Sequence, residues 1–222
     1  MKFQPSTVAV ALTFVAGSVD GLTLIVVGRF ASHMTGTTSM LVHDLARGRL
    51  AVGMAALGAL FAFASGASVA GLLVGDRTSD RQVERLPLLL VIEAVSLIGA
   101  GVVGDGGSND VAVMLALSAF AMGVQNASSS LCLGDRVRTT HLTGTLTDLG
   151  IAVGRLVRVG RMGPHHPPIA EMLRRSSSRL AAFAIGGLLA GMVAPAVGRL
   201  GLLAPSAVLF ACALGRLPTH RR

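Results

Sequence analysis

Long apolar stretches alternate with short polar ones along the whole chain. Six of them are close to the roughly 20 residues that an α-helix needs to cross a bilayer. They are Thr7 to Gly28, Leu50 to Gly75, Leu86 to Gly104, Val111 to Leu131, Leu180 to Val197, and Leu200 to Leu217. The period-2 alternation of an outer-membrane barrel is absent. The pattern therefore predicts an all-α polytopic membrane helix bundle, with residues 1–222 as a single membrane domain.

Composition supports this class of protein. Apolar residues make up 52% of the chain and charged residues 14%, too few to cover the surface of a soluble globule. The lipid bilayer is thus the predicted partner. The first residues of the chain resemble a signal peptide because Lys2 precedes an apolar run. The run continues past Asp20 to Val27, however, which favours a retained first span.

The net charge of +8 is best explained by membrane orientation. With the N-terminus in the cytoplasm, most of the 19 basic residues fall in inside segments, and only Arg29, Arg47, Arg49 and Arg199 fall outside. The positive-inside rule then predicts that both termini are cytoplasmic. We expect no nucleic-acid partner. A polar cytoplasmic loop is predicted at about residues 160–178.

A short polar motif occurs twice, 108 residues apart. His33-Met34-Thr35-Gly36-Thr37 matches His141-Leu142-Thr143-Gly144-Thr145. Upstream, residues 17–21 lie opposite 123–127, and downstream Gly and Ala positions also agree. Because the matching blocks occur in the same order in both parts of the chain, they indicate a duplication, with repeats at 7–104 and 111–217. Because each repeat holds three predicted spans, the second enters the membrane from the opposite side, as in inverted-repeat transporters.

The same residues carry a resemblance to a known family. Gly-x-x-Asp in the first span, Gly28-Arg29-Phe30, His-Met-Thr-Gly, Gly-Val-Gln-Asn-Ala and Leu-Thr-Gly-Thr-Leu-Thr resemble the YoaK-type family of uncharacterised bacterial inner-membrane proteins. The resemblance implies a six-span, multi-pass protein of the bacterial inner membrane and brings no established activity. The chain departs from the family at Thr37, where an Asn is usual, and in the length of its 160–178 loop.

The repeated motif is typical of the start of a helix. Threonine is a good N-cap, glycine permits unusual backbone paths, and the residues that follow have helical composition. Helices starting at Gly36 and Gly144 would direct free N–H groups at a common anion if both dipped into the membrane as re-entrant half-helices. The alternative is a pair of interfacial helices that lie along the lipid headgroups.

Several polar residues are candidates for binding or proton coupling. A carboxylate within a span costs at least about 2.5 kcal/mol, so Asp20 and Glu93 require a polar partner, a wet cavity or protonation. Asn126 is the counterpart of Asp20 in the second repeat, and Gln125 adjoins it. The matched histidines suggest a metal only weakly, since no third ligand is evident. The alternative role for the polar residues is hydrogen bonding between helices. The candidate solute-binding residues are Asp20, His33, Thr35, Gly36, Thr37, Gln125, Asn126, His141, Thr143, Gly144 and Thr145, with Asp20 and Glu93 for proton coupling.

These features predict a permease for a small, anionic or carboxylate-bearing solute, with proton coupling through Asp20. The alternative is a membrane scaffold or assembly partner that transports nothing, and the small-residue faces of the spans would also serve a homo-oligomer. No enzyme, metal or cofactor signature is present, so we expect no enzymatic activity.

Overall fold

The computed structural model describes residues 5–75, 82–103, 107–133, 139–159 and 167–215, which are helical almost throughout. The predicted all-α class is therefore confirmed for this part of the chain. The elements are α1 (Pro5–Val27), α2 (Met34–Ala46), α3 (Leu50–Val74), α5 (Leu86–Val102), α6 (Ser108–Leu133), α7 (Leu142–Val159), α8 (Pro167–Val197), the 3-10 helix η1 (Gly198–Leu202) and α9 (Leu203–Leu214).

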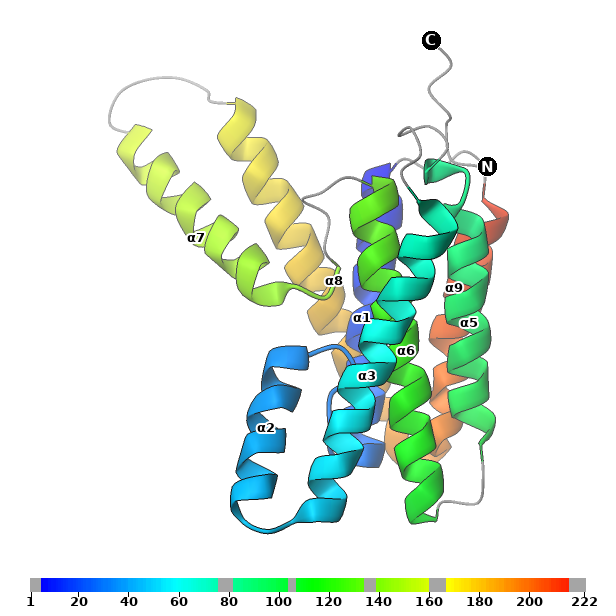
Figure 1. Ribbon diagram of the computed structural model, residues 1–222. Coiled ribbons are helices and arrows are strands. Elements are labelled where there is room, and N and C mark those ends of the chain that lie inside the picture. Colours follow the sequence, from blue (N-terminus) through cyan, green and yellow to red (C-terminus); the bar gives the residue numbers. More distant parts are fainter. Residues whose placement is uncertain (1–4, 76–81, 104–106, 134–138, 160–166, 216–222) are drawn as a thin grey trace.

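The long helices pass up and down through one bundle (Figure 1). Helices α1, α5 and α8 run in one direction, and α3, α6 and α9 run in the other. The most extensive contacts join α1 to α8 and α3 to α6, while α5 packs between α6 and α9. Helix α7 and the first half of α8 form an arm that leans away from the bundle (Figure 1).

Glycines bring the two main helix pairs into close contact. A Cβ on Gly17 would lie 2.1 Å from the carbonyl oxygen of Phe183, and one on Gly186 would lie 2.3 Å from that of Phe14. Helices α3 and α6 pack against each other in the same way. There, a Cβ on Gly66 would lie 2.1 Å from the Phe120 oxygen, and one on Gly123 would lie 2.0 Å from the Phe63 oxygen. Backbones this close leave no room for a side chain, as in other small-residue membrane interfaces.

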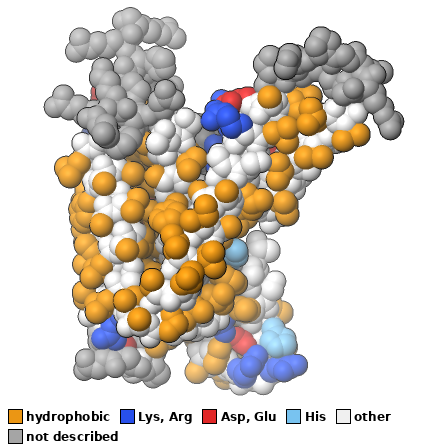
Figure 2. Space-filling view, turned by 180° about the vertical axis from the view of Figure 1, so that it is seen from behind, with side chains coloured by type: hydrophobic (Ala, Val, Ile, Leu, Met, Phe, Trp, Pro, Cys, Tyr) orange, Lys and Arg blue, Asp and Glu red, His pale blue; other side chains and the backbone are white. Residues whose placement is uncertain are grey.

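Hydrophobic side chains also cover the outside of the bundle. On the face shown in Figure 2 they form a band, and the charged side chains gather towards its ends. Four stretches are long and apolar enough to span a membrane: Ser6–Val27, Leu50–Val74, Asn109–Leu133 and Pro168–Leu214. The last contains α8, η1 and α9, and the shorter apolar α5 covers Leu86–Val102. The molecule thus has the character of a helical integral membrane protein.

The prediction of a polar loop at about residues 160–178 is wrong for its second part, which is helical. From Pro167 to residue 178 it is the first part of α8, while residues 160–166 lie outside the described part. Proline suits the first turn of a helix because its missing N–H needs no partner there. Glu171 then pairs with Arg174 three residues on and with Arg175 four residues on. These ion pairs link successive turns and favour a helix over a solvated loop.

Candidate functional site

The chain turns back into the bundle after α1, and Asp20 holds the returning segment. The turn occurs at Gly28, whose φ of +74° suits glycine. Oδ1 of Asp20 accepts hydrogen bonds from the backbone N–H groups of Ala31 and Ser32, both at 2.9 Å. Oδ2 accepts one from the Ser32 hydroxyl at 2.5 Å. Buried irregular backbone needs such internal partners, so the carboxylate takes the place of water here.

The segment before the second motif is held by neutral amides of α6. The Thr140 hydroxyl donates to Oδ1 of Asn126 at 3.1 Å, as Ser32 donates to Asp20. The Gln125 amide donates to the Thr139 hydroxyl at 2.8 Å and also to the carbonyl of Leu12 in α1 at 2.9 Å. Asp20 and Asn126 occupy equivalent positions in α1 and α6. Asp20 and Asn126 each lie seven residues before the helix ends, roughly 10 Å from that end.

Each repeated motif forms the first turn of a short helix. Helix α2 begins at Met34 and α7 at Leu142, each directly after the motif histidine. The prediction that threonine caps these helices is therefore wrong: His33 is the N-cap of α2 and makes no side-chain capping bond. The hydroxyls of Thr37 and Thr145 instead donate back to the carbonyls of the two histidines.

The first turn of α2 also leaves backbone donors free. The N–H of Thr37 donates to the His33 carbonyl at 2.9 Å, whereas those of Thr35 and Gly36 have no acceptor in the described part of the chain. Helix starts lack intrahelical partners for their first N–H groups and carry a partial positive charge. Both properties attract an anion.

The two first turns line one cavity of about 390 Å³. Figure 1 shows α2 and α7 starting near the middle of the bundle's height and running towards opposite ends. The cavity is lined by Phe30, Ser32, His33, Met34, Thr35, Gly36, Thr37, Met40, Phe63, Asn126, Thr140, His141, Leu142 and Thr143. Among the lining residues that the structure describes, the polar side chains are hydroxyl, amide and imidazole groups, and none is a Lys, Arg, Asp or Glu.

The candidate residues separate into two groups around this cavity. His33, Thr35, Gly36, Thr37, Asn126, His141 and Thr143 line it. Asp20, Gln125, Gly144, Thr145 and Glu93 are not among its lining residues. Sequence reasoning missed Ser32 and Thr140. The signal for them was present, because a hydroxyl residue directly precedes the histidine in both motifs.

The two histidines occupy different surroundings. The His33 ring stacks on Phe30 with the ring centres 4.7 Å apart and lies 6.0 Å from that of Phe183. Its Nε2 is 3.3 Å from Oδ2 of Asp20. His141 is exposed and lies over Gly144, where a Cβ would come within 2.5 Å of the imidazole Nδ1. Among the described residues, no three His, Cys, Asp or Glu side chains cluster in a way that could hold a metal ion.

Glu93 is fully buried on α5 and away from the cavity lining. Neither of its carboxyl oxygens has a hydrogen-bond partner among the described residues. Its surroundings contrast with those of Asp20, whose two oxygens accept three hydrogen bonds. Glu93 is therefore not part of the structure that positions the motifs.

The far end of α2 is fixed by charge. Asp44 accepts a hydrogen bond from Arg29 at 2.5 Å and pairs with Arg49 at 2.6 Å. The bond from Arg29 lowers the pKa of Asp44 below its usual value, and the charge of Arg49 acts in the same direction. A carboxylate near a helix C-terminus is normally disfavoured by the helix dipole, and these two guanidinium groups offset that.

Comparison with known proteins identifies a family. No curated protein and no solved structure matches the chain. A family model described as "Protein of unknown function (DUF1275)" matches residues 8–215, which is nearly the whole chain. The chain, with its paired motifs and buried Asp20, therefore belongs to the DUF1275 family.

Proposed function

We propose that this protein is a permease of the bacterial inner membrane for a small anionic or carboxylate-bearing solute, and that it is of the YoaK type. The main observation in its support is that the first turns of α2 and α7 line one cavity. Solute sites in many secondary transporters are formed by interrupted helices whose N-termini meet near the bilayer midplane. Binding and movement of a solute through this site need no catalytic group.

The proposal includes an inverted repeat with six spans: α1 to α5 in one half and α6 to α9 in the other. Two pairs of equivalent contacts support it. The first helix of each half packs on the third helix of the other half, through Gly17 with Phe183 and through Gly123 with Phe63. The hydrogen bond from Ser32 to Asp20 has its counterpart between Thr140 and Asn126. Rocking of one half against the other would open the cavity to each side in turn.

The cavity chemistry supports a small anion as the solute. Its volume of about 390 Å³ suits a small molecule. The free N–H groups of Thr35 and Gly36 supply donors, as do the hydroxyl of Thr143 and the amide of Asn126. A solute with one negative charge needs no arginine or lysine here, because helix N-termini alone favour a carboxylate.

Proton coupling would act through Asp20 as a positioning residue. Its carboxylate holds the backbone of Ala31 and Ser32, and these residues lead directly into the first turn of α2. Protonation would remove acceptors from this segment and so change the cavity indirectly. Glu93 is the second coupling candidate because its buried carboxyl has no partner in the described structure.

Both termini are proposed to be cytoplasmic. Arg174, Arg175 and Arg179 lie near the start of α1, whereas Arg199 lies near the other end of α1. This distribution puts the arginine-rich end on the inside, as the positive-inside rule requires.

Transport by purified protein in liposomes tests the proposal. We expect uptake of one member of a panel of short carboxylates that starts with acetate, and no uptake of glycerol. Gly36→Leu should reduce that uptake at least about tenfold because the new side chain enters the cavity. Gly58→Leu is the matched control, since Gly58 faces open space. If no member of the panel is bound or transported, or if both variants are equally impaired, the permease hypothesis is wrong.

A non-transporting scaffold or homo-oligomer is the second candidate. In its favour, most residues of the α3 and α8 spans are not buried within the molecule, and Gly71 and Gly191 face open space on them. Gly66 and Gly186 do not discriminate between the candidates, because packing within the chain already requires them. Gly71→Leu and Gly191→Leu should abolish self-association if the scaffold hypothesis holds, and should leave solute uptake intact if the permease hypothesis holds.

A further inference from the structure

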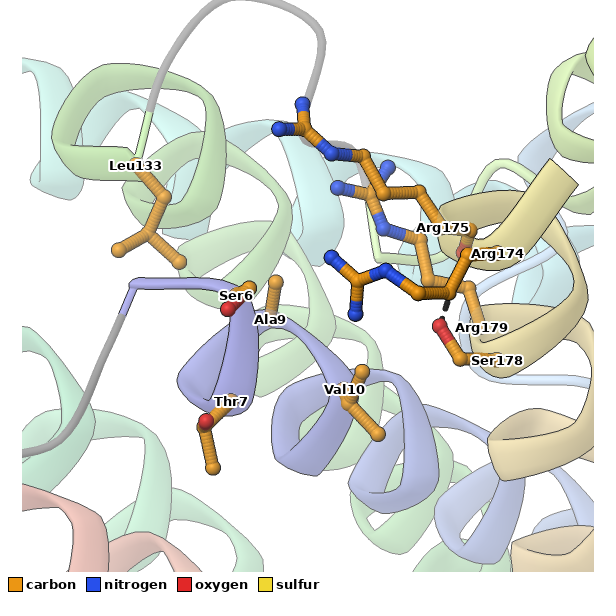
Figure 3. A pocket seen from close by; sticks show the side chains of 9 residues that line it. All are labelled: Ser6, Thr7, Ala9, Val10, Leu133, Arg174, Arg175, Ser178 and Arg179. Atoms are coloured by element: carbon orange, nitrogen blue, oxygen red, sulfur yellow. Dashed lines mark hydrogen bonds between the residues drawn. The ribbon is translucent and has the colours of Figure 1, made fainter. Parts of the chain in front are cut away.

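A second cavity lies between the start of α1 and the first half of α8 (Figure 3). Its volume is about 440 Å³, and it shares no lining residue with the cavity between the motifs. It is lined by Ser6, Thr7, Ala9, Val10, Leu133, Arg174, Arg175, Ser178 and Arg179. The face in Figure 2 shows charged side chains in the notch between the bundle and the arm.

Three arginines dominate the charge of this cavity. Figure 3 shows the side chains of Arg174, Arg175 and Arg179 leaving α8 on the same side and extending towards Leu133 and Ser6. Glu171 accepts hydrogen bonds from Arg174 and Arg175 and thereby fixes their direction. Asp148 interacts electrostatically with Arg179. Even with both carboxylates counted, positive charge remains in excess.

Arg179 is the group that lacks a close partner. Its side chain is partly buried, and neither a hydrogen bond nor a salt bridge engages its guanidinium in the described structure. Arg175 lies near enough to repel it. Two positive charges this close repel each other, and an anion bound between them would offset that repulsion. A guanidinium suits phosphate in particular, because its planar fork of N–H donors matches the phosphate oxygens.

We propose that this cavity binds a phosphate group, carried either by an anionic phospholipid or by a soluble phosphate. Arg175 and Arg179 would contact the phosphate oxygens, and the hydroxyls of Ser6 and Thr7 on α1 offer further donors opposite them. Ala9, Val10 and Leu133 add an apolar wall beside which the glycerol end of a phospholipid would fit. A bound phosphate would join the arm to the bundle. This inference does not depend on the permease hypothesis.

Two binding measurements on the full-length protein separate the two sources of phosphate. Native mass spectrometry would compare retention of phosphatidylglycerol with that of phosphatidylcholine, and calorimetry in detergent would titrate inorganic phosphate. Selective retention of phosphatidylglycerol identifies a lipid site, and a saturable heat identifies a soluble phosphate. In whichever measurement is positive, Arg179→Gln should weaken binding at least about tenfold, as expected for loss of a charge-assisted hydrogen bond.

Two further variants keep the test decisive. Arg158→Gln removes one charge from α7, outside the cavity lining, and should leave binding unchanged. Arg179→Lys keeps the charge and should bind more tightly than Arg179→Gln, even if both lower thermal stability. Equal weakening in Arg158→Gln and Arg179→Gln, or the absence of selective binding in both measurements, would overturn the proposal.

Discussion

At the scale of single residues, the Asp20 carboxylate holds the segment that returns to the bundle after α1. A carboxylate seven residues before the end of an apolar helix requires a polar partner, and its match to Asn126 followed from the repeat. Its partners could not be predicted, because they depend on the reversal of the chain at Gly28. The backbone of Ala31 and Ser32 satisfies the carboxylate, which therefore supports the cavity from behind its lining.

Replacing Asp20 should destabilise the protein in proportion to the acceptors lost. Asp20→Ala leaves two backbone N–H groups and the Ser32 hydroxyl without their acceptor, which predicts a cost of about 2 to 5 kcal/mol. Asp20→Asn keeps one carbonyl oxygen and should cost less. Thermal unfolding in detergent, followed by circular dichroism, measures the difference. Equal melting temperatures for Asp20→Ala and the unaltered protein would contradict this role for the carboxylate.

The Asp44 ion pairs give a pH-dependent prediction. A carboxylate with a lowered folded-state pKa contributes stability above its unfolded pKa of about 3.9 and loses it as the pH falls through the folded value. Asp44→Asn should therefore melt at a lower temperature than the unaltered protein at pH 7, and the gap should close well below pH 4. A gap that stays constant with pH would show that the charge of Asp44 is not the source of the stabilisation.

At the scale of elements, the repeat predicted the short helices better than their boundaries. Both helices begin one residue before the predicted threonine cap, because the histidine carbonyl already accepts the first helical hydrogen bonds. The start of α8 was predicted as a loop from its polarity alone. The spacing of Glu171, Arg174 and Arg175 was the overlooked signal, since residues three and four apart meet on a helix.

Equivalent glycines in the two helix pairs should respond alike to substitution. Gly17→Ala and Gly123→Ala each place a methyl group about 2 Å from a carbonyl oxygen, so the helices must separate. We expect each to lower stability by about 1 to 3 kcal/mol, the usual cost of overpacking. Gly58→Ala is the matched control and should have little effect because nothing lies near that position. Melting temperatures that do not distinguish Gly17→Ala from Gly58→Ala would contradict the observed packing.

At the scale of the whole molecule, the halves form one bundle in which each half completes the other. Helix α1 packs on α8, α3 packs on α6, and Gln125 of the second half donates to Leu12 of the first. Periodicity and composition predicted the helices and the membrane class. The repeated motif raised the hypothesis of two helix starts directed at one anion, but its sequence left interfacial helices equally open. That the two motifs line one cavity depends on how helices distant in sequence cross. The proposed solute could not be identified from the sequence, because backbone N–H groups and hydroxyls would supply its contacts.

The central claim is that both motifs line one solute site within the membrane, and cysteine accessibility tests it most directly. In a background with Cys132 and Cys212 replaced by serine, Thr35→Cys and Thr143→Cys would each be exposed, in sealed vesicles, to a membrane-impermeant thiol reagent added from one side at a time. Alternating access predicts that each cysteine reacts from both sides, and that the transported carboxylate slows both reactions. Reaction of Thr35→Cys only from the outside and of Thr143→Cys only from the inside would contradict the account and indicate two interfacial helices.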